Sequence, residues 1–260
     1  MDLEKLFFDP EEKPLDRIVN NGGFCGIFRT IGCVGDSMSS GEFETLSDEG
    51  ISGWHDFYEY SWGQYMARNT GTKVYNFSKG GMTAKWFMES FARECGAWST
   101  PCQAYIIALG ANDINYALNN NISLGGTEEI NTPSNETFAG AYTNIILNLK
   151  RRQPDAKFFL VTLPVTTNPK EEIQQQYDRQ AEIIYEIAEK YKNCYVIDLR
   201  KYAPAFDKEF EKKFHLRGHL NPMGYKLISL MIESYMDYII RHNMEDFSKA
   251  GLIGTQLHNV

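Results

Sequence analysis

Four short blocks of this sequence carry residues that could do chemistry. An apolar stretch ends in Gly-Asp-Ser at Ser37, and the other three blocks contain Gly81, Asn112 and His219. A serine becomes an effective nucleophile when a base takes its proton and when donors stabilise the oxyanion formed on the carbonyl that it attacks. The other blocks offer a histidine, a glycine backbone and a side-chain amide, so nucleophilic chemistry at Ser37 is the first hypothesis.

The blocks depend on strands that bring them to one place. Short, mostly apolar runs predict five strands covered on both faces, at Phe28–Val34, Lys73–Phe77, Ala104–Leu109, Lys157–Thr162 and Cys194–Asp198. The blocks of Ser37, Gly81 and Asn112 each follow one of the first three strands. In a parallel sheet these positions share the carboxyl edge, where open α/β sheets bind ligands.

Helix-like segments alternate with the strands. They are expected at Ser61–Asn69, Thr83–Cys95, Glu136–Arg151, Glu171–Tyr191 and about Pro222–Asn243. The alternation predicts a five-stranded parallel sheet between two layers of helices, a three-layer α/β/α sandwich. We expect a single domain over residues 1–260, with residues 1–27 as an N-terminal extension. The polar stretch Asn115–Asn135 is expected to be a long loop at the rim of the site.

Composition narrows the class of partner. The net charge of −8 argues against a nucleic-acid partner, since nucleic-acid-binding proteins usually show a basic face. No apolar run approaches the ~18 residues of a membrane span, and the N-terminus lacks a basic segment followed by an apolar one. We therefore expect a cytoplasmic protein without a membrane partner. The five cysteines are odd in number and lack zinc spacing, so reduced thiols are expected.

At its four blocks the chain resembles the SGNH, or GDSL-type, hydrolase family. The family's signatures are a Gly-Asp-Ser serine, a glycine after the second strand, a Gly-x-Asn-Asp after the third and a histidine near the C-terminus. All four occur here in that order, over roughly Arg29 to Tyr225. The resemblance implies a flavodoxin-like fold and a serine esterase or acylhydrolase that needs no cofactor.

The resemblance also implies a role for each block. Ser37 would be the nucleophile and His219 its base. The oxyanion hole would combine the backbone N–H groups of Ser37 and Gly81 with the side-chain amide of Asn112. Glycine lets the backbone at position 81 approach a substrate closely, and an amide donates a hydrogen bond without carrying charge.

Each of these residues also has a purely structural interpretation. Ser37 could cap the helix that follows it, and Gly81 could belong to a turn. Asn112 could form an Asx turn, and His219 could be a surface residue. Asp36 is expected to be a turn or capping residue rather than an acid catalyst. The occurrence of all four blocks together, three of them at strand ends, favours a functional site.

One position departs from the family pattern. The acid of the triad usually stands three residues before the histidine, where this chain has Leu216. Leucine can neither orient an imidazole nor stabilise imidazolium. Three explanations stay open: a Ser–His dyad with a backbone carbonyl on His219 Nδ1, a carboxylate from elsewhere, or a loss of catalysis. The candidate carboxylates are Asp198, Asp207, Glu209 and Glu211.

Three neighbouring features could extend the site. His215 and His219 stand four residues apart, but Gly218 argues against the helix that such a zinc pair needs, so no metal is expected. Arg217 could pair with an anionic substrate, although a surface or ion-pair role is the simpler expectation. An aromatic cluster could stack on sugars or belong to the core, and it comprises Trp54, Phe57, Tyr58, Tyr60 and Trp62.

The sequence as a whole predicts a serine hydrolase that cleaves carboxylic esters through a Ser37 acyl-enzyme. The resemblance suggests an acyl group on a carbohydrate as one substrate, and lipid or thioester substrates stay open. His219 would pass the Ser37 proton to the leaving alkoxide and then activate water. The alternative is a non-catalytic protein of the same fold that binds a glycan or an acyl ligand, and Leu216 is the feature that favours it.

Overall fold

The predicted strands form one parallel sheet in the computed structural model, which describes residues 8–167 and 170–259. They are β1 (Thr30–Gly35), β4 (Lys73–Ser78), β5 (Ala104–Ala108), β6 (Lys157–Val161) and β7 (Cys194–Ile197). Their spatial order is β4-β1-β5-β6-β7, and every pair is parallel. This is the flavodoxin-like order, so the predicted fold class is confirmed.

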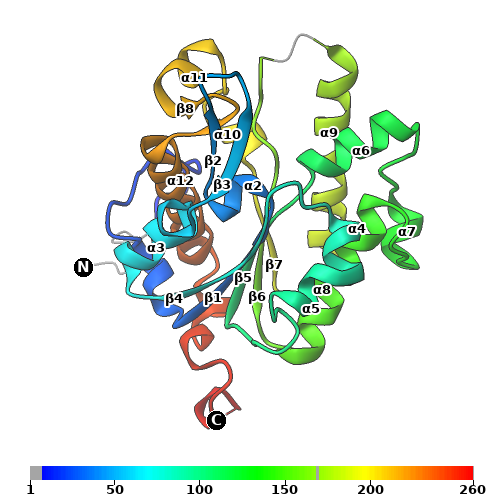
Figure 1. Cartoon of the computed structure of the whole chain (residues 1–260). Coiled ribbons are helices and arrows are strands. Elements are labelled where there is room, and N and C mark those ends of the chain that lie inside the picture. The colour runs from blue at the N-terminus through cyan, green and yellow to red at the C-terminus, as the bar shows by residue number, and fades with distance from the viewer. Residues whose placement is uncertain (1–7, 168–169, 260) are drawn as a thin grey trace.

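Long helices cover both faces of the sheet (Figure 1). The helices α3 (Trp62–Thr70) and α12 (Pro222–His242) lie on one face, and α8 (Phe138–Arg152) and α9 (Glu171–Lys190) lie on the other. Strand β5 shows why two layers are needed, because its side chains alternate between the two cores. Ile106 packs with the α12 layer and Ile107 with the α8 layer, and both are fully buried.

The remaining elements are short. The helices are α2 (Ser37–Ser40), α4 (Ala84–Trp86), α5 (Ala92–Glu94), α6 (Ala111–Asn120), α7 (Thr127–Asn131), α10 (Leu199–Tyr202), α11 (Lys208–Phe214) and α13 (Met244–Phe247). Tight helical turns occur at η1 (Gly23–Ile27), η2 (Tyr58–Tyr60), η4 (Ala250–Leu252) and η5 (Gln256–Asn259), and η3 (Phe87–Phe91) is a π-helical segment. Two antiparallel hairpins pair β2 (Glu42–Leu46) with β3 (Ser52–Asp56), and β8 (His215–Leu216) with β9 (His219–Leu220).

One expectation about loops needs correction. The stretch Asn115–Asn135 is not a long loop, because it contains most of α6 and all of α7. Helix α6 buries Ile114 and Ala117, one helical turn apart, and this spacing stabilises it despite the polar composition. The expected helix Thr83–Cys95 is confirmed: α4, η3 and α5 follow one another without a gap from Ala84 to Glu94, and the middle segment η3 is π-helical.

The N-terminal segment packs along α12. The expected extension covers residues 1–27, of which residues 1–7 lie outside the described part of the chain. The backbone N–H of Val19 donates to Ser234 Oγ at 3.0 Å, and Arg241 pairs with Glu12 at 2.6 Å. These contacts anchor the segment away from the carboxyl edge of the sheet.

The helices and the cysteines of the described chain were compared with two expectations from the sequence. Within the described ranges, no helix is both long enough and apolar enough to cross a membrane. The five cysteines are all free thiols, and three of them, Cys25, Cys33 and Cys102, are buried.

Candidate active site

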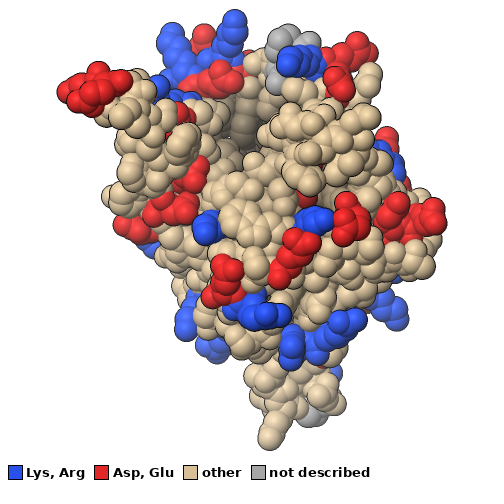
Figure 2. Space-filling view, turned by 45° about the vertical axis from the view of Figure 1, so that its right-hand side comes forward, with Lys and Arg blue, Asp and Glu red and all other residues tan. Residues whose placement is uncertain are grey.

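The carboxyl edge of the sheet gathers three of the predicted residues. Strand β1 leads into Ser37, β4 leads to Gly81 and β5 leads to Asn112. Because β1 lies between β4 and β5, the three loops are neighbours. The crevice beside β1 is the switch point of this strand order, where ligands bind in such sheets. In the space-filling view the surface is hollowed near the top, at the end where the strands finish (Figure 2).

Ser37 begins the short helix α2 and is partly exposed. Asp36 caps this helix, because its Oδ1 accepts a hydrogen bond from Met38 N–H at 3.0 Å, so the predicted capping role of Asp36 is confirmed. Burial raises the pKa of the Asp36 carboxyl to about 6. Within the described ranges, the Ser37 hydroxyl makes no hydrogen bond, and it is therefore not used as a cap.

The two other predicted oxyanion donors lie next to each other. Gly81 has φ +73°, a left-handed conformation that favours glycine, and no atom lies within 4 Å of where a Cβ would stand. Asn112 Nδ2 donates to the carbonyl of Met82 at 3.2 Å and lies 3.5 Å from Asp36 Oδ2. The amide therefore joins the Gly81 loop to the residue before Ser37. The oxyanion roles of Ser37, Gly81 and Asn112 stay predictions.

The β8–β9 hairpin positions His219. Strand β9 packs against β2 and α2, which brings His219 to the same edge of the molecule as Ser37. His219 pairs with Leu216 across the hairpin, while His215 pairs with Leu220. Adjacent positions of a strand face opposite sides, so the two histidines point apart. No group of three or more His, Cys, Asp or Glu side chains among the described residues could hold a metal ion.

A carboxylate that the sequence analysis did not single out stands beside His219. Glu42 Oε1 lies 3.1 Å from His219 Nε2, and Glu42 is only 9 % exposed. The other ring nitrogen, Nδ1, is buried and has no hydrogen-bond partner among the described side chains and backbone, so a backbone carbonyl does not hold it. No hydrogen bond within the described chain joins the Ser37 hydroxyl to His219.

Three of the four candidate carboxylates are engaged elsewhere. Asp198 accepts hydrogen bonds from Thr162 and Tyr185, and Asp207 caps α11. Glu209 lies 3.9 Å from Lys213, and Glu211 is exposed on the same helix. Glu42 was missed because it lies only five residues after Ser37 and reaches His219 through the β2–β3 hairpin. The alternation of Glu42 and Glu44 with Phe43 was the available signal for that strand.

Glycine at position 80 makes room for the Glu42 carboxylate. A Cβ at Gly80 would stand 2.0 Å from Glu42 Oε2, closer than any real contact allows. Glu42 is therefore held between His219 and the loop that carries Gly81. The backbone at Glu42 is fixed as well, because the hydroxyl of Tyr225 in α12 donates to the backbone carbonyl of Glu42 at 2.7 Å.

The charges around His219 are mostly negative. Burial raises the pKa of Glu42, and the nearby carboxylates of Asp56, Asp36 and Glu44 raise it further. Burial lowers the pKa of His219, while the carboxylates of Glu44 and Asp56 oppose that shift. The imidazole is therefore neutral near neutral pH, the state that a general base requires.

Arg217 has a structural partner. It occupies the turn between β8 and β9 with φ +63°, and its Nε lies 3.6 Å from Glu44 Oε1. The other oxygen of Glu44 accepts the backbone N–H of Gly218 at 3.0 Å. Glu44 thus holds the turn that precedes His219, which agrees with the expected ion-pair role of Arg217.

A cavity of about 280 Å³ lies beside α2, and we call it the α2 cavity. Apolar side chains dominate its wall, among them Met38, Leu163 and Phe206. Two polar atoms on the wall, Ser39 Oγ and His215 Nε2, are buried without a hydrogen-bond partner in the described chain. The cavity suits a largely apolar group that also carries a polar atom.

The aromatic cluster is divided between core and surface. Trp62 is 2 % exposed and belongs to the core, whereas Trp54 is 61 % exposed. Trp54 is the cross-strand partner of Glu44 in the β2–β3 hairpin. Directly opposite residues share a face of a hairpin, and alternate residues along a strand do too, so Trp54 lies on the face that carries Glu42 and Glu44.

Comparison with known proteins agrees with the fold. The chain resembles the structure of an acetyl xylan esterase, AlAXEase, with 16 % identity, a TM-score of 0.54 and coverage of 79 % of this chain and 98 % of that one. It also resembles a family two carbohydrate esterase from Clostridium thermocellum in complex with cellohexaose, with 14 % identity, a TM-score of 0.58 and coverage of 90 % and 66 %.

A third solved structure carries a description relevant to the two hypotheses. It is a carbohydrate esterase whose active site is said to display divergent catalytic and non-catalytic binding functions, with 15 % identity, a TM-score of 0.51 and coverage of 89 % and 69 %. A search of curated protein sequences gave no significant match. At these identities the likenesses establish the fold, and the sequence pattern of the GDSL-like lipase/acylhydrolase family matches residues 33–227. The resemblance seen in the sequence is confirmed, and the chain belongs to the GDSL-like lipase/acylhydrolase family.

Proposed function

We propose that this chain is a serine esterase in which Ser37 is the nucleophile, His219 the base and Glu42 the carboxylate that holds the base. Family membership supports ester hydrolysis in general. The observation that carries the finer proposal is the 3.1 Å contact between Glu42 and His219 at the edge of the sheet where Ser37 begins α2. It supplies the acid that Leu216 cannot.

The proposed reaction has two steps. His219 takes the Ser37 proton as Oγ attacks the ester carbonyl, and the developing oxyanion accepts hydrogen bonds from the N–H groups of Ser37 and Gly81. It also accepts one from the Asn112 amide, whose long 3.5 Å contact with Asp36 Oδ2 gives way to the oxyanion. Each such donor is typically worth ~3 kcal/mol of transition-state stabilisation. The proton then passes to the leaving alkoxide, and water activated by His219 releases the acid and restores Ser37.

Glu42 acts through the histidine. Its carboxylate at Nε2 favours the tautomer with the proton on Nε2 and stabilises the imidazolium formed during attack. The nitrogen left to accept the Ser37 proton is then Nδ1, which is buried and has no partner in the described chain. The proposal requires Ser37 Oγ to reach Nδ1 in the substrate complex, where catalytic hydrogen bonds often tighten.

The surrounding carboxylates favour the binding of a neutral substrate and the release of an anionic product. Asp36, Glu44 and Asp56 all lie close enough to raise the pKa of Glu42. A neutral ester enters such a site without an electrostatic penalty, whereas the carboxylate released by hydrolysis is repelled. This setting disfavours substrates that carry phosphate or free carboxylate next to the ester.

Acylated carbohydrates are the proposed substrates. The exposed Trp54 on the Glu42 face of the hairpin offers a flat surface for a sugar ring on the alcohol side of the ester. The α2 cavity, which includes Met38 next to Ser37, offers space for the acyl group. Two compared proteins, an acetyl xylan esterase and a carbohydrate esterase bound to cellohexaose, act on or bind carbohydrate, and this choice of substrate is consistent with them.

The test is hydrolysis of p-nitrophenyl acetate and butyrate by the wild type, Ser37→Ala and His219→Ala, followed by a panel of acetylated xylan and cellulose oligosaccharides. The proposal expects turnover by the wild type and background rates for both variants. Equal rates in the wild type and Ser37→Ala would remove Ser37 as the nucleophile.

A second function, non-catalytic binding of a glycan or acyl ligand, is favoured by one observation. The Ser37 hydroxyl and His219 are not hydrogen-bonded to each other in the described chain. One compared carbohydrate esterase is itself described as having catalytic and non-catalytic binding functions. Saturable binding of an acylated oligosaccharide, with no turnover by the wild type of any ester in the panel, would favour this second function.

A further inference from the structure

A second pocket lies beside the loop that carries Gly81. It has a volume of about 220 Å³ and is formed by α4, α6 and the segment that leads into α8. Thr83 and Asp113 line it, while their sequence neighbours Gly81 and Asn112 belong to the candidate active site. The pocket is therefore distinct from the Ser37 site but is built from two of the same chain segments.

The carboxyl group of Asp113 points to a ligand. Its Oδ1 accepts the backbone N–H of Ala84 at 2.9 Å and so fixes the start of α4. Its Oδ2 has no hydrogen-bond partner among the described residues, although Asp113 is only 6 % exposed. A buried polar atom left without a partner costs roughly 1–3 kcal/mol. A hydroxyl group of a ligand in the pocket would remove that cost.

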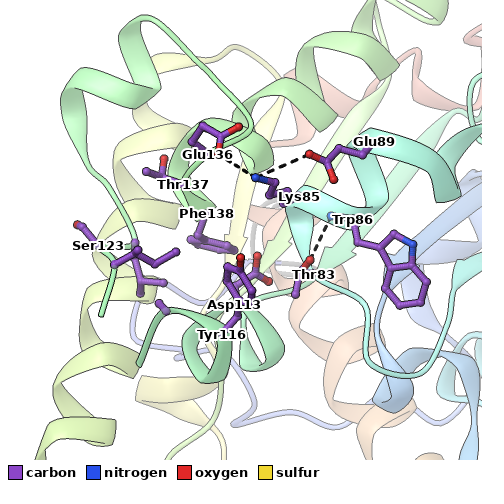
Figure 3. A pocket seen from close by; sticks show the side chains of 13 residues that line it. Thr83, Lys85, Trp86, Glu89, Asp113, Tyr116, Ser123, Glu136, Thr137 and Phe138 are labelled. Atoms are coloured by element: carbon purple, nitrogen blue, oxygen red, sulfur yellow. Dashed lines mark hydrogen bonds and ion pairs between the residues drawn. The ribbon is translucent and has the colours of Figure 1, made fainter. Parts of the chain in front are cut away.

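The charges at the rim disfavour an anion. Lys85 stands between Glu136, at 2.8 Å, and Glu89, at 3.8 Å (Figure 3). Its positive charge is therefore compensated, and with Asp113 the pocket holds more acidic than basic groups. Burial raises the pKa of Asp113 to about 7, so near neutral pH this carboxyl group can donate as well as accept a hydrogen bond. A neutral ligand rich in hydroxyl groups suits these conditions.

The remaining wall has two kinds of surface. Tyr116 and Phe138 present aromatic rings. The hydroxyl oxygens of Thr83 and Thr137 accept backbone N–H groups as helix caps, so each hydroxyl keeps its own hydrogen to donate. A pyranose ring matches both, because its edge carries hydroxyl groups and its faces carry C–H groups that pack on aromatic rings. The volume is below the roughly 300–1,000 Å³ of sites for drug-sized molecules, which limits the occupant to about one ring.

We propose that this pocket binds one neutral sugar residue, with Asp113 Oδ2 hydrogen-bonded to a ring hydroxyl and Tyr116 packed against a ring face. It is a carbohydrate subsite separate from the ester-cleaving site. Because Asn112 and Asp113 are neighbours in α6, an oligosaccharide bound in this pocket passes close to the loop that carries Gly81. The subsite extends the proposed function but does not depend on chemistry at Ser37.

The test uses the full chain with Ser37→Ala, so that no probe is turned over. Xylose, glucose, N-acetylglucosamine, xylohexaose and cellohexaose are the probes, and binding is measured by saturation-transfer NMR and calorimetry. At least one neutral sugar is expected to bind saturably. Asp113→Ala, which removes the carboxyl group, and Tyr116→Ala are each expected to raise its Kd about tenfold, the loss of one buried contact. Leu257→Ala, at an exposed position near the C-terminus, is the matched control and should not change Kd.

Several outcomes would overturn the subsite. They are an absence of binding by every neutral sugar, binding that neither variant weakens, and binding only of glucosamine or another cationic amine. Loss of monosaccharide binding in Trp54→Ala would place the sugar in the Ser37 cleft instead. Failure of the esterase proposal is separate, because it shows as a lack of p-nitrophenyl acetate turnover by the wild type, and Leu257→Ala in a chain that keeps Ser37 should leave that turnover unchanged.

Discussion

The imidazole of His219 and the carboxylate of Glu42 meet at 3.1 Å, although the two residues are 177 positions apart in the sequence. The β2–β3 and β8–β9 hairpins, both outside the main sheet, bring them together. A carboxylate at this histidine replaces the acid that the family pattern usually places three residues before it, where this chain has Leu216.

Removing the charge of Glu42 should slow the chemical step. Glu42→Gln keeps the size of the side chain but cannot stabilise imidazolium, so we expect kcat to fall about 100-fold, or ~3 kcal/mol, with little change in KM. Steady-state kinetics on p-nitrophenyl acetate measures both constants. Glu209→Gln, on the exposed face of α11, is the matched control, and a similar loss in that variant would argue against a specific role for Glu42.

A side chain at position 80 should act through Glu42. Gly80→Ala places a methyl group where the Glu42 carboxylate lies, so the carboxylate must move away from His219. We expect a fall in kcat comparable to that of Glu42→Gln, and little further loss when the two changes are combined. If kinetics of the double variant showed the two losses to be fully additive, Gly80 would not act by making room for Glu42.

The acid limb of the activity profile should depend on Glu44. The Glu44 carboxylate favours protonated His219 and raises its pKa, so Glu44→Gln should lower that pKa. With a lower pKa, the imidazole of His219 stays neutral over a wider range of pH. The acid limb of kcat/KM is therefore expected to move to lower pH in Glu44→Gln, as measured from pH 4 to 8. A limb that stays in place or moves upward would show that His219 is not the titrating base.

Asp113 should make the wild type less stable as the pH rises. Its folded-state pKa of about 7 lies above the ordinary value of 3.8, so the folded chain holds this proton more tightly than the unfolded chain does. The stabilisation is present below pH 4 and is lost as the pH rises toward 7. Asp113→Asn cannot ionise and keeps an acceptor for Ala84 N–H.

Urea unfolding at pH 5 and pH 8 measures this effect. The free energy of unfolding of Asp113→Asn minus that of the wild type should increase by roughly 2–3 kcal/mol from pH 5 to pH 8. This value corresponds to the roughly two pH units between pH 5 and the folded-state pKa of about 7. Asp113→Ala, which also loses the hydrogen bond to Ala84, should show the same pH trend from a lower starting stability. Parallel pH dependence in wild type and Asp113→Asn would rule out the raised pKa.

Trp54 should matter for carbohydrate esters and not for simple ones. Its exposed ring lies on the hairpin face that carries Glu42. Trp54→Ala is expected to raise KM for acetylated oligosaccharides about tenfold, the value of one sugar–aromatic contact of ~1.4 kcal/mol, and to leave p-nitrophenyl acetate hydrolysis unchanged. An equal effect on both substrates would mean that Trp54 supports the fold of the hairpin rather than the substrate.

The regular part of the fold was predictable because the signals are local. The apolar run before Ser37 and the apolar segment Ala104–Ala108 are strands buried on both faces, and Pro222 marks the start of α12 as expected. The order of the glycine and asparagine blocks after these strands was enough to place Ser37, Gly81 and Asn112 at one edge.

The missed parts depend on contacts that sequence spacing does not reveal. The β2–β3 hairpin has a largely exposed second strand, so its pattern is weak, and Glu42 is recognised only when β9 packs beside it. The sequence predicts a loop where α6 forms, because asparagines hide the buried pair Ile114 and Ala117. In both cases tertiary packing, rather than local preference, decides the outcome.

The most direct test of the central claim is covalent labelling of the full chain by a fluorophosphonate, followed by peptide mass spectrometry. A serine activated by a neighbouring base reacts with such a reagent, whereas an ordinary serine does not. We expect one adduct on Ser37, no adduct in Ser37→Ala, and much slower labelling in both His219→Ala and Glu42→Gln. An unlabelled Ser37, or labelling at the same rate in His219→Ala and Glu42→Gln as in the wild type, would contradict the proposed Ser37, His219 and Glu42 site.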